Sequence, residues 1–449
     1  MTECNTKPLA FSSLCRKQIV ADFDGGWITS DGGGLLLREV DRKIGLIEAL
    51  AGCITDRRDP RSITHSVASM LRQRVVGIAL GYEDLADHQT LRDDPLMKLL
   101  AGRDPSAAAP LASPPTLSRL ENGVDRAALA RLAEVFVETF IASHTRPPKE
   151  LVLDFDATDD PLHGTQEGRF FHGYYDAYCY LPLYVFCGDQ LLVAYLRPAN
   201  IDASKHSRAI LKLLVRRFRQ VWPGVRIIVR ADSGFCRWRL MRWCDRHDVG
   251  YILGLARNKR LEALAEPLMR QAAERFQATG TKQRLFGEVT YAAGTWDRPR
   301  RVIIKAEYLT LGPNTRFVAT NVEDEPQPLY DGRYCARGEM ENRIKEQQLD
   351  LFADRTSCHR FLANQFRLLL ASAAYVLVET LRQVGLAGTE LERAQAGTIR
   401  VRLLKIGARV RVSVRRVVLH LASGYPLQGL LRRVVWRLTR WLTPAAAVS

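Results

Sequence analysis

The stretch Leu151-Val-Leu-Asp-Phe-Asp-Ala-Thr158 alternates Leu151, Leu153 and Phe155 with Val152, Asp154 and Asp156. This alternation predicts a β-strand that carries both carboxylates on one face. A carboxylate on a buried strand is costly unless another group compensates its charge. Partners for these acids are therefore expected elsewhere in the chain.

Two later segments carry further acids. The β-branched run from Arg226 to Asp232 predicts a second strand that ends in an acid and is followed by a turn, and Glu341 lies on a predicted helix after Gly338. Three carboxylates on two strands and a helix can bind Mg²⁺, which prefers oxygen ligands and needs few of them from the protein. The pattern indicates phosphoryl transfer on nucleic acid by a two-metal mechanism. For each acid alone, the alternative is a cap or a solvated turn residue.

Composition narrows the class of protein. A chain of 449 residues with 47% hydrophobic residues is expected to form two to four globular domains. Its 65 Lys and Arg exceed its 49 Asp and Glu, a net charge of +16. Such a charge favours a polyanionic partner, and nucleic acid is the leading candidate, although a generically basic protein is the alternative.

Cysteine usage and hydropathy indicate the compartment. The nine cysteines are odd in number and contain no C-x-x-C pair, which favours reduced thiols and argues against a zinc module. No apolar run is expected to reach the length of a membrane span, and the N-terminus lacks the apolar segment of a signal peptide. We therefore expect a cytoplasmic protein without a membrane partner.

The order of predicted elements gives an α/β fold class with five regions. Residues 1–149 have helical apolar spacing and form a helical N-terminal domain, a candidate for DNA binding. Residues 150–257 run strand, hairpin, helix, strand, helix, strand, the order of an RNase H-like catalytic core. Residues 258–331 predict a β-rich insertion. Residues 332–390 complete the core with the helix of Glu341, and residues 391–449 form a basic C-terminal region.

The basic C-terminal region predicts a hairpin followed by a helix. Thr398–Lys405 and Arg409–Arg416 are the two predicted strands, and Leu427–Trp441 is the predicted basic amphipathic helix. Between Arg400 and Arg440 there are 11 Lys or Arg and no acid. Arginines on one face suit a phosphate backbone, and the alternatives are a solvated face or a membrane-surface helix. The candidate DNA contacts are Arg409, Arg411, Arg415 and Arg416.

Several segments together resemble the bacterial insertion-sequence transposases with a group-one DDE catalytic domain. The helical region resembles the same family, so the likeness runs from about residue 20 to 420. The Tyr-x2-Arg-x3-Glu element is its most specific part. The matching segments are Leu153-Asp-Phe-Asp-Ala-Thr-Asp-Asp160, Arg230-Ala-Asp-Ser-Gly-Phe235, Gly254-Leu-Ala-Arg-Asn258, Tyr334-Cys-Ala-Arg-Gly-Glu-Met-Glu-Asn-Arg-Ile-Lys345, Gly81–His88 and Thr116–Asn122.

The resemblance implies roles for the acids. Asp156, Asp232 and Glu341 would form the catalytic triad that binds metal. Asp156 is preferred over Asp154 because it is the acid of the D-x-T pattern.

The resemblance also implies DNA contacts beside the triad. Tyr334 and Arg337 would hold the DNA end near the acids. The family pattern continues to a lysine seven residues after the glutamate, where this chain has Gln348. Lys345, one helical turn from Glu341, is the candidate substitute.

The implied reaction uses two Mg²⁺ ions, or Mn²⁺, and no nucleotide cofactor. Hydrolysis at each element end frees a 3′ hydroxyl, which attacks target DNA without a covalent protein intermediate. Relatives excise through a hairpinned DNA end, and the β-rich insertion resembles the domain that supports this step. Pairing two double-stranded DNA ends implies a homodimer, associated with the bacterial nucleoid.

Two other functions stay open at this point. One is a metal-dependent RNase H-like DNA nuclease that cuts and does not join. The other is a DNA-binding derivative of a transposase that has lost catalysis, although all three carboxylates are present.

Overall fold

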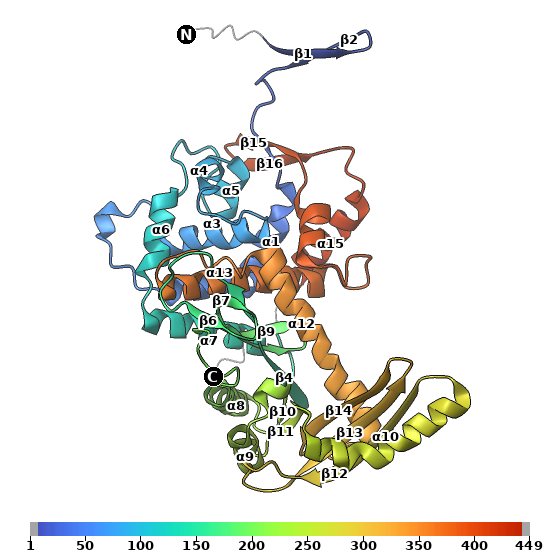
Figure 1. The fold of residues 1–449 in the computed structure, drawn as a ribbon. Coiled ribbons are helices and arrows are strands. Elements are labelled where there is room, and N and C mark those ends of the chain that lie inside the picture. Colours follow the sequence, from blue (N-terminus) through green and yellow to red (C-terminus); the bar gives the residue numbers. More distant parts are fainter. Residues whose placement is uncertain (1–7, 442–449) are drawn as a thin grey trace. The chain divides into compact units, whose positions relative to one another are not determined.

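The computed structural model describes residues 8–441 (Figure 1). These residues form two compact units. Among these residues, unit 1 comprises 8–43, 56–119 and 380–441, and unit 2 comprises 44–55 and 120–379. Each unit is therefore assembled from segments that are distant in sequence. The five predicted regions and their boundaries stay a prediction.

Unit 2 is built on an eight-stranded mixed sheet in the order β12-β13-β14-β11-β10-β4-β8-β9. The central strands β4, β10 and β11 are parallel, and the strands on both sides of them are antiparallel. The strands are β4 (Glu150–Ala157), β8 (Leu183–Cys187), β9 (Gln190–Tyr195), β10 (Arg226–Ala231), β11 (Gly250–Leu255), β12 (Gln283–Tyr291), β13 (Arg300–Leu309) and β14 (Gly312–Thr320).

Both faces of the sheet are covered. The larger core packs Leu153 and Phe155 of β4 against helices that include α8, and the smaller core packs Ile228 of β10 against Leu329 and Tyr330. Central parallel strands buried on both faces are expected to be apolar, as Ile227, Ile228 and Val229 of β10 are. The helices of this unit are α2 (Leu46–Gly52), α7 (Arg126–Ala142), α8 (Ser207–Val221), α9 (Trp238–Arg246), α10 (Lys259–Thr279), α11 (Pro326–Pro328) and α12 (Gly338–Lys345).

These elements confirm the predicted α/β class and several predicted elements. Basic and apolar residues interleaved over Ser207–Val221 predict a helix, and α8 has these limits. Strands β8 and β9 form the predicted antiparallel hairpin. The three strands predicted as a β-rich insertion are preceded by the 21-residue helix α10, and they continue the central sheet because β14 pairs with β11. The RNase H-like assignment stays a prediction.

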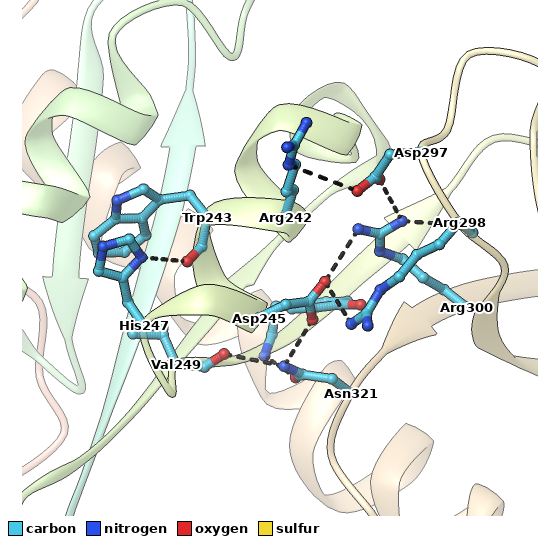
Figure 2. Close-up of polar contacts among 10 residues, drawn as sticks. Arg242, Trp243, Asp245, His247, Val249, Asp297, Arg298, Arg300 and Asn321 are labelled. Carbon is cyan, nitrogen blue, oxygen red and sulfur yellow. Dashed lines mark hydrogen bonds and ion pairs between the residues drawn. The ribbon is translucent and has the colours of Figure 1, made fainter.

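A polar network joins the loop before β13 and the end of β14 to helix α9 (Figure 2). Asp245 accepts bonds from Arg298 at 2.7 Å, Arg300 at 3.0 Å and Asn321 at 3.4 Å. Arg300 also contacts Asp297 at 3.0 Å, so its buried guanidinium is shared by two carboxylates. Breaking a buried ion pair costs several kcal/mol, and this network therefore holds β13 and β14 to the core.

A small three-stranded sheet follows the end of β4. Its order is β5-β7-β6, with β5 (Asp160–Pro161), β6 (Phe170–His172) and β7 (Ala177–Tyr180). This sheet lies in unit 2, and its strands follow the predicted acids of β4 in the sequence.

Unit 1 combines helices with a sheet in the order β16-β15-β3 and a separate hairpin of β1 and β2. The strands are β1 (Leu9–Leu14), β2 (Lys17–Ala21), β3 (Ile28–Thr29), β15 (Ala408–Ser413) and β16 (Arg416–Leu421). The helices are α3 (Val67–Ala79), α4 (His88–Leu91), α5 (Pro95–Leu100), α14 (Ala396–Ile399) and α15 (Gln428–Arg440). Helices α1 (Leu35–Ile44), α6 (Pro114–Gly123) and α13 (Phe361–Thr380) include residues of both units.

The predicted strand over Thr398–Lys405 is wrong. This stretch is helical, and β15 instead pairs with β16 across a turn at Val414 and Arg415. Ile399 and Leu403 are buried one helical turn apart, and this spacing outweighed the short alternation that suggested a strand. The predicted basic helix is confirmed as α15.

One stretch departs from the expectation about membrane spans. The helical run Phe361–Gly385 is long and apolar enough to cross a membrane by length and composition. However, 78% of the most apolar stretch of this run is buried within the protein. A buried core helix meets the same criterion, and its apolar surface here is covered by protein.

Candidate active site at the ends of strands β4 and β10

The register of two parallel strands brings the first two predicted acids to one edge of the sheet. In the β4–β10 pairing, Asp154 is opposite Arg230 and Phe155 is opposite Ala231. The next residues along the two strands are Asp156 and Asp232. Their side chains therefore emerge beside each other where the strands end, because paired residues in a ladder share a face.

Asp154 does not take part in this edge, because Arg230 binds its carboxylate. Arg230 Nε and Nη2 donate to Asp154 Oδ1 and Oδ2 at 2.5 and 2.7 Å, and both side chains are buried. Arg230 also donates to the backbone oxygen of Arg333. The bidentate pair saturates this carboxylate, so Asp154 has a structural role.

Asp232 is oriented by the turn that follows β10. Its Oδ1 accepts from the backbone N–H of Gly234 at 2.9 Å and caps a short 3₁₀ turn. Gly254 of β11 lies against this turn: a Cβ at Gly254 would come 3.0 Å from Ser233 N and 2.5 Å from the hydroxyl of Tyr334. Only glycine allows Tyr334 and the Asp232 turn to approach β11 this closely.

Arg337 connects the third acid to the first. Its guanidinium lies 3.4 Å from Asp156 Oδ2 and 2.7 Å from Glu341 Oε1. Burial would lower the pKa of Arg337, but the surrounding acidic groups, Asp156 and Glu341 first among them, together outweigh burial and raise it. The Arg-x3-Glu spacing supplies this geometry, because residues four apart lie on one helical face.

The acid edge carries unfavourable electrostatic energy. Burial raises the pKa of Asp156 to about 7, Arg337 partly opposes this shift, and the negative charges of Asp232 and Glu341 add to it. A carboxyl group with this pKa is poised to lose its proton near neutral pH or when a cation approaches. The coupling of Asp156 to both other acids indicates that all three belong to one electrostatic site.

The donor chemistry of this edge suits a hard cation. Within residues 8–441, however, no three acidic, histidine or cysteine side chains are assembled closely enough to hold a metal ion. Arg337 lies between Asp156 and Glu341 and supplies the positive charge there. Because Asp156, Asp232 and Glu341 all offer carboxylate oxygens, the type of ligand fits Mg²⁺ or Mn²⁺ if Arg337 releases Glu341.

Lys345 and Gln348 occupy different surroundings. Lys345 is exposed one turn after Glu341. Gln348 donates to Asp160 Oδ1 at 2.9 Å and to the backbone oxygen of Asp159 at 3.0 Å. Gln348 thus joins the helical segment that follows Glu341 to the loop that follows β4. Burial raises the pKa of Asp160 to about 8, so this contact joins an amide to a largely protonated acid at neutral pH.

Sequence reasoning missed one residue beside the acids, Tyr175. Its hydroxyl lies 3.4 Å from the backbone oxygen of Ala157, the residue after Asp156. Burial raises the pKa of Tyr175, and the charges of Asp159 and Asp156 raise it further. The signal in the sequence is the dense aromatic run Phe170–Tyr180 that surrounds Tyr175.

The four predicted C-terminal arginines lie in unit 1. Arg409 and Arg411 are exposed on the same face of β15, whereas Arg415 and Arg416 lie at the β15–β16 turn. A groove of about 710 Å³ is lined by Arg409, Arg411, Arg416 and by Trp27, whose backbone oxygen accepts from Val410 at 2.7 Å. The aromatic side chain of Trp27 in this basic groove was also missed, because it lies almost 400 residues away in sequence.

Comparison with known proteins gives one strong match. A family model described as transposase DDE domain, group 1, matches residues 11–443 of this chain. No curated protein sequence matches this chain. Among solved structures, the cryo-EM structure of a piggyBac transposase synaptic complex with hairpin DNA aligns with a TM-score of 0.40 and 11% identity, over 84% of this chain and 80% of that chain. A structural similarity this weak supports no conclusion about this chain.

Proposed function

The chain belongs to the group 1 family of transposase DDE domains, and we propose that it is the DNA transposase of a bacterial insertion sequence. It would bind the inverted repeats at both ends of the element, cleave a phosphodiester at each end, and join the ends to target DNA. The observation that supports this proposal is geometric: Asp156 and Asp232 follow paired residues of β4 and β10, and Arg337 contacts both Asp156 and Glu341.

Asp156, Asp232 and Glu341 would hold two Mg²⁺ ions, or Mn²⁺, which when bound stabilise charge on the phosphate oxygens and make water a better nucleophile. In the first step, water oxygen forms a bond to phosphorus and the 3′ oxygen leaves as a hydroxyl. In the second step, this 3′ oxygen forms a bond to a target phosphorus and displaces the target 3′ oxygen. One phosphodiester breaks as another forms, so no nucleotide cofactor is required.

Arg337 and Tyr334 are proposed to position the DNA end. Arg337 already contacts two of the three acids, and a guanidinium can exchange a carboxylate for a phosphate because both present paired oxygens. We propose that an incoming phosphate draws Arg337 from Glu341 and frees that carboxylate for a cation. Lys345, exposed on the same helix, is proposed as a further phosphate contact.

The basic groove of unit 1 is proposed to bind duplex DNA outside the acid edge. Its arginines Arg409, Arg411 and Arg416, with Arg415 at the adjoining turn, offer several phosphate contacts. Removing them should weaken DNA binding and reduce its dependence on salt, because each phosphate contact releases counterions. Two element ends must be held together for joining, which supports a homodimer on DNA.

The test begins with the DNA that flanks the coding region. Inverted repeats near both ends would provide the substrate for cleavage by purified protein with Mg²⁺. Asp156→Asn, Asp232→Asn and Glu341→Gln should each abolish cleavage and keep DNA binding measurable. Retained cleavage in any one of them removes that acid from the triad.

A strand-transfer assay separates the remaining candidates. The transposase uses a 3′ hydroxyl as nucleophile and yields joined products with target DNA, whereas a nuclease yields only cut ends. A DNA-binding derivative without catalysis would bind the repeats and produce neither.

A further inference from the structure

An exposed aromatic surface lies on the small sheet beside the acid edge. Four large aromatic side chains within nine residues are exposed: Phe170 (41%), Phe171 (52%), Tyr174 (85%) and Tyr178 (46%). Exposed aromatic side chains in a contiguous patch usually mark a binding surface, because burying them would otherwise contribute to folding. Phe170 precedes Phe171 on β6, so its side chain points to the other face of the strand. We call Phe171, Tyr174 and Tyr178 the aromatic surface.

The aromatic surface has an ordered arrangement. Phe171 and Tyr178 are opposite each other in the β6–β7 ladder, with ring centroids 5.6 Å apart. The guanidinium of Arg169 lies 3.9 Å from the centre of the Tyr178 ring, which holds that ring in place. The Phe171 and Tyr178 rings are therefore presented by paired strands.

Tyr175 joins this surface to the active site. Its ring contacts the Tyr174 ring at 5.0 Å, and its hydroxyl contacts the backbone oxygen of Ala157, next to Asp156, at 3.4 Å. Tyr175 therefore links Tyr174, the most exposed ring of the aromatic surface, to the end of the acid-bearing strand β4. A ligand on the aromatic surface would lie beside a phosphate at the acid edge.

We infer that the aromatic surface stacks unpaired nucleobases of the DNA strand held at the acid edge. The inference rests on the proposed function. Every base has an aromatic face, so stacking tolerates any sequence, and aromatic side chains near a backbone-binding site are the usual means of holding single strands. Arg169 adds a cation beside Tyr178, as expected for a surface that meets a polyanion.

The binding test compares two strands with the same number of phosphates. The full chain is titrated, without divalent ions, into a fluorescent 20-nucleotide oligothymidylate and into the same strand without bases, and anisotropy is followed. The strand with bases should bind on the order of tenfold more tightly, because each stacked base contributes measurably. Equal affinities for the two strands would overturn the inference.

Substitutions assign the preference to the aromatic surface. Phe171→Ala with Tyr174→Ala should bring the two affinities within about twofold of each other, whereas Tyr174→Trp should keep the preference, since both rings stack on bases. Tyr195→Ala is the matched control, because Tyr195 is also exposed but lies on the edge strand β9. A preference that survives the double substitution, or disappears in Tyr195→Ala, would overturn the assignment.

Two further measurements distinguish base stacking from self-association and from catalysis at the acid edge. Sedimentation without DNA tests whether the double substitution changes the oligomeric state, which would instead make this surface a contact between copies of the chain. Metal-dependent cleavage of duplex DNA is measured on the same proteins. If the unaltered protein prefers the strand with bases but does not cleave DNA, the proposed transposase is refuted and the stacking surface is not. If it cleaves DNA but shows no preference for the strand with bases, only the stacking surface is refuted.

Discussion

The middle of strand β4 and its carboxyl end each carry an aspartate on the same face of the sheet, but their surroundings differ. Asp154 is buried against Arg230, which donates two hydrogen bonds to it. Two residues on, Asp156 is 3.4 Å from a guanidinium shared with Glu341 and is repelled by two other acids. The comparison teaches that a saturated ion pair marks a structural acid, whereas an incompletely compensated acid marks a candidate functional site.

The largest expected effect is the loss of cleavage in Asp156→Asn. The amide keeps the size of the side chain but removes the negative charge that a cation needs, so the cleavage rate should fall by on the order of 10⁴. Single-turnover cleavage of an element end measures this rate. Asp248→Asn, an exposed aspartate of unit 2 on a turn with positive φ that asparagine tolerates, is the control and should cleave normally. Equal losses in both variants would contradict the comparison.

Asp154→Asn should instead lower stability. It leaves the buried guanidinium of Arg230 without its carboxylate, and breaking a buried pair in this way costs about 3–5 kcal/mol. Urea unfolding measures the change in free energy. If Asp154→Asn unfolds like the unaltered chain and loses only cleavage, Asp154 belongs with the reactive acids and our distinction between the two fails.

The third prediction concerns pH. The folded-state pKa of Asp156, about 7, lies above its usual value, so its contribution to stability is present at low pH and is lost as pH rises through about 7. Asp156→Asn has no such proton, and its stability relative to the unaltered chain should increase from pH 4 to pH 8 by up to about 4 kcal/mol without metal ions.

Thermal or urea unfolding across this pH range checks the sign. Mg²⁺ should reduce the difference between the two proteins, because a bound cation stabilises the ionised carboxylate of Asp156. A difference that is constant with pH would show that the carboxyl group of Asp156 is ionised throughout.

The smallest expected effect is at Gln348. Gln348→Ala removes the donor to buried Asp160 and should cost about 1–3 kcal/mol, because a buried acceptor is left unsatisfied. Gln348→Lys restores a donor at this position and should cost less. Urea unfolding of both variants measures the difference, and equal costs would indicate that the contact with Asp160 is not what Gln348 provides.

Local pattern determined much of unit 2. Alternation identified β4, β-branched residues identified β10, and amphipathic spacing gave α8 its observed limits. The Arg-x3-Glu spacing likewise placed Arg337 beside Glu341, because a helix fixes which residues share a face. Local pattern failed at Thr398–Lys405, where alternation and helical spacing overlap and packing favoured the helix.

Only the tertiary structure decided which groups meet. Asp156 and Asp232 are neighbours because of a strand register, which depends on the packing of the whole sheet and not on either strand alone. The same register places Arg230 beside Asp154, whereas the separate β5-β7-β6 sheet brings Tyr175 against Ala157 of β4. By itself, therefore, the sequence determined the local elements and the residue types of the site. Charge compensation depends on distances across the fold, and for that reason the tertiary structure alone distinguished the fully paired Asp154 from the incompletely compensated Asp156.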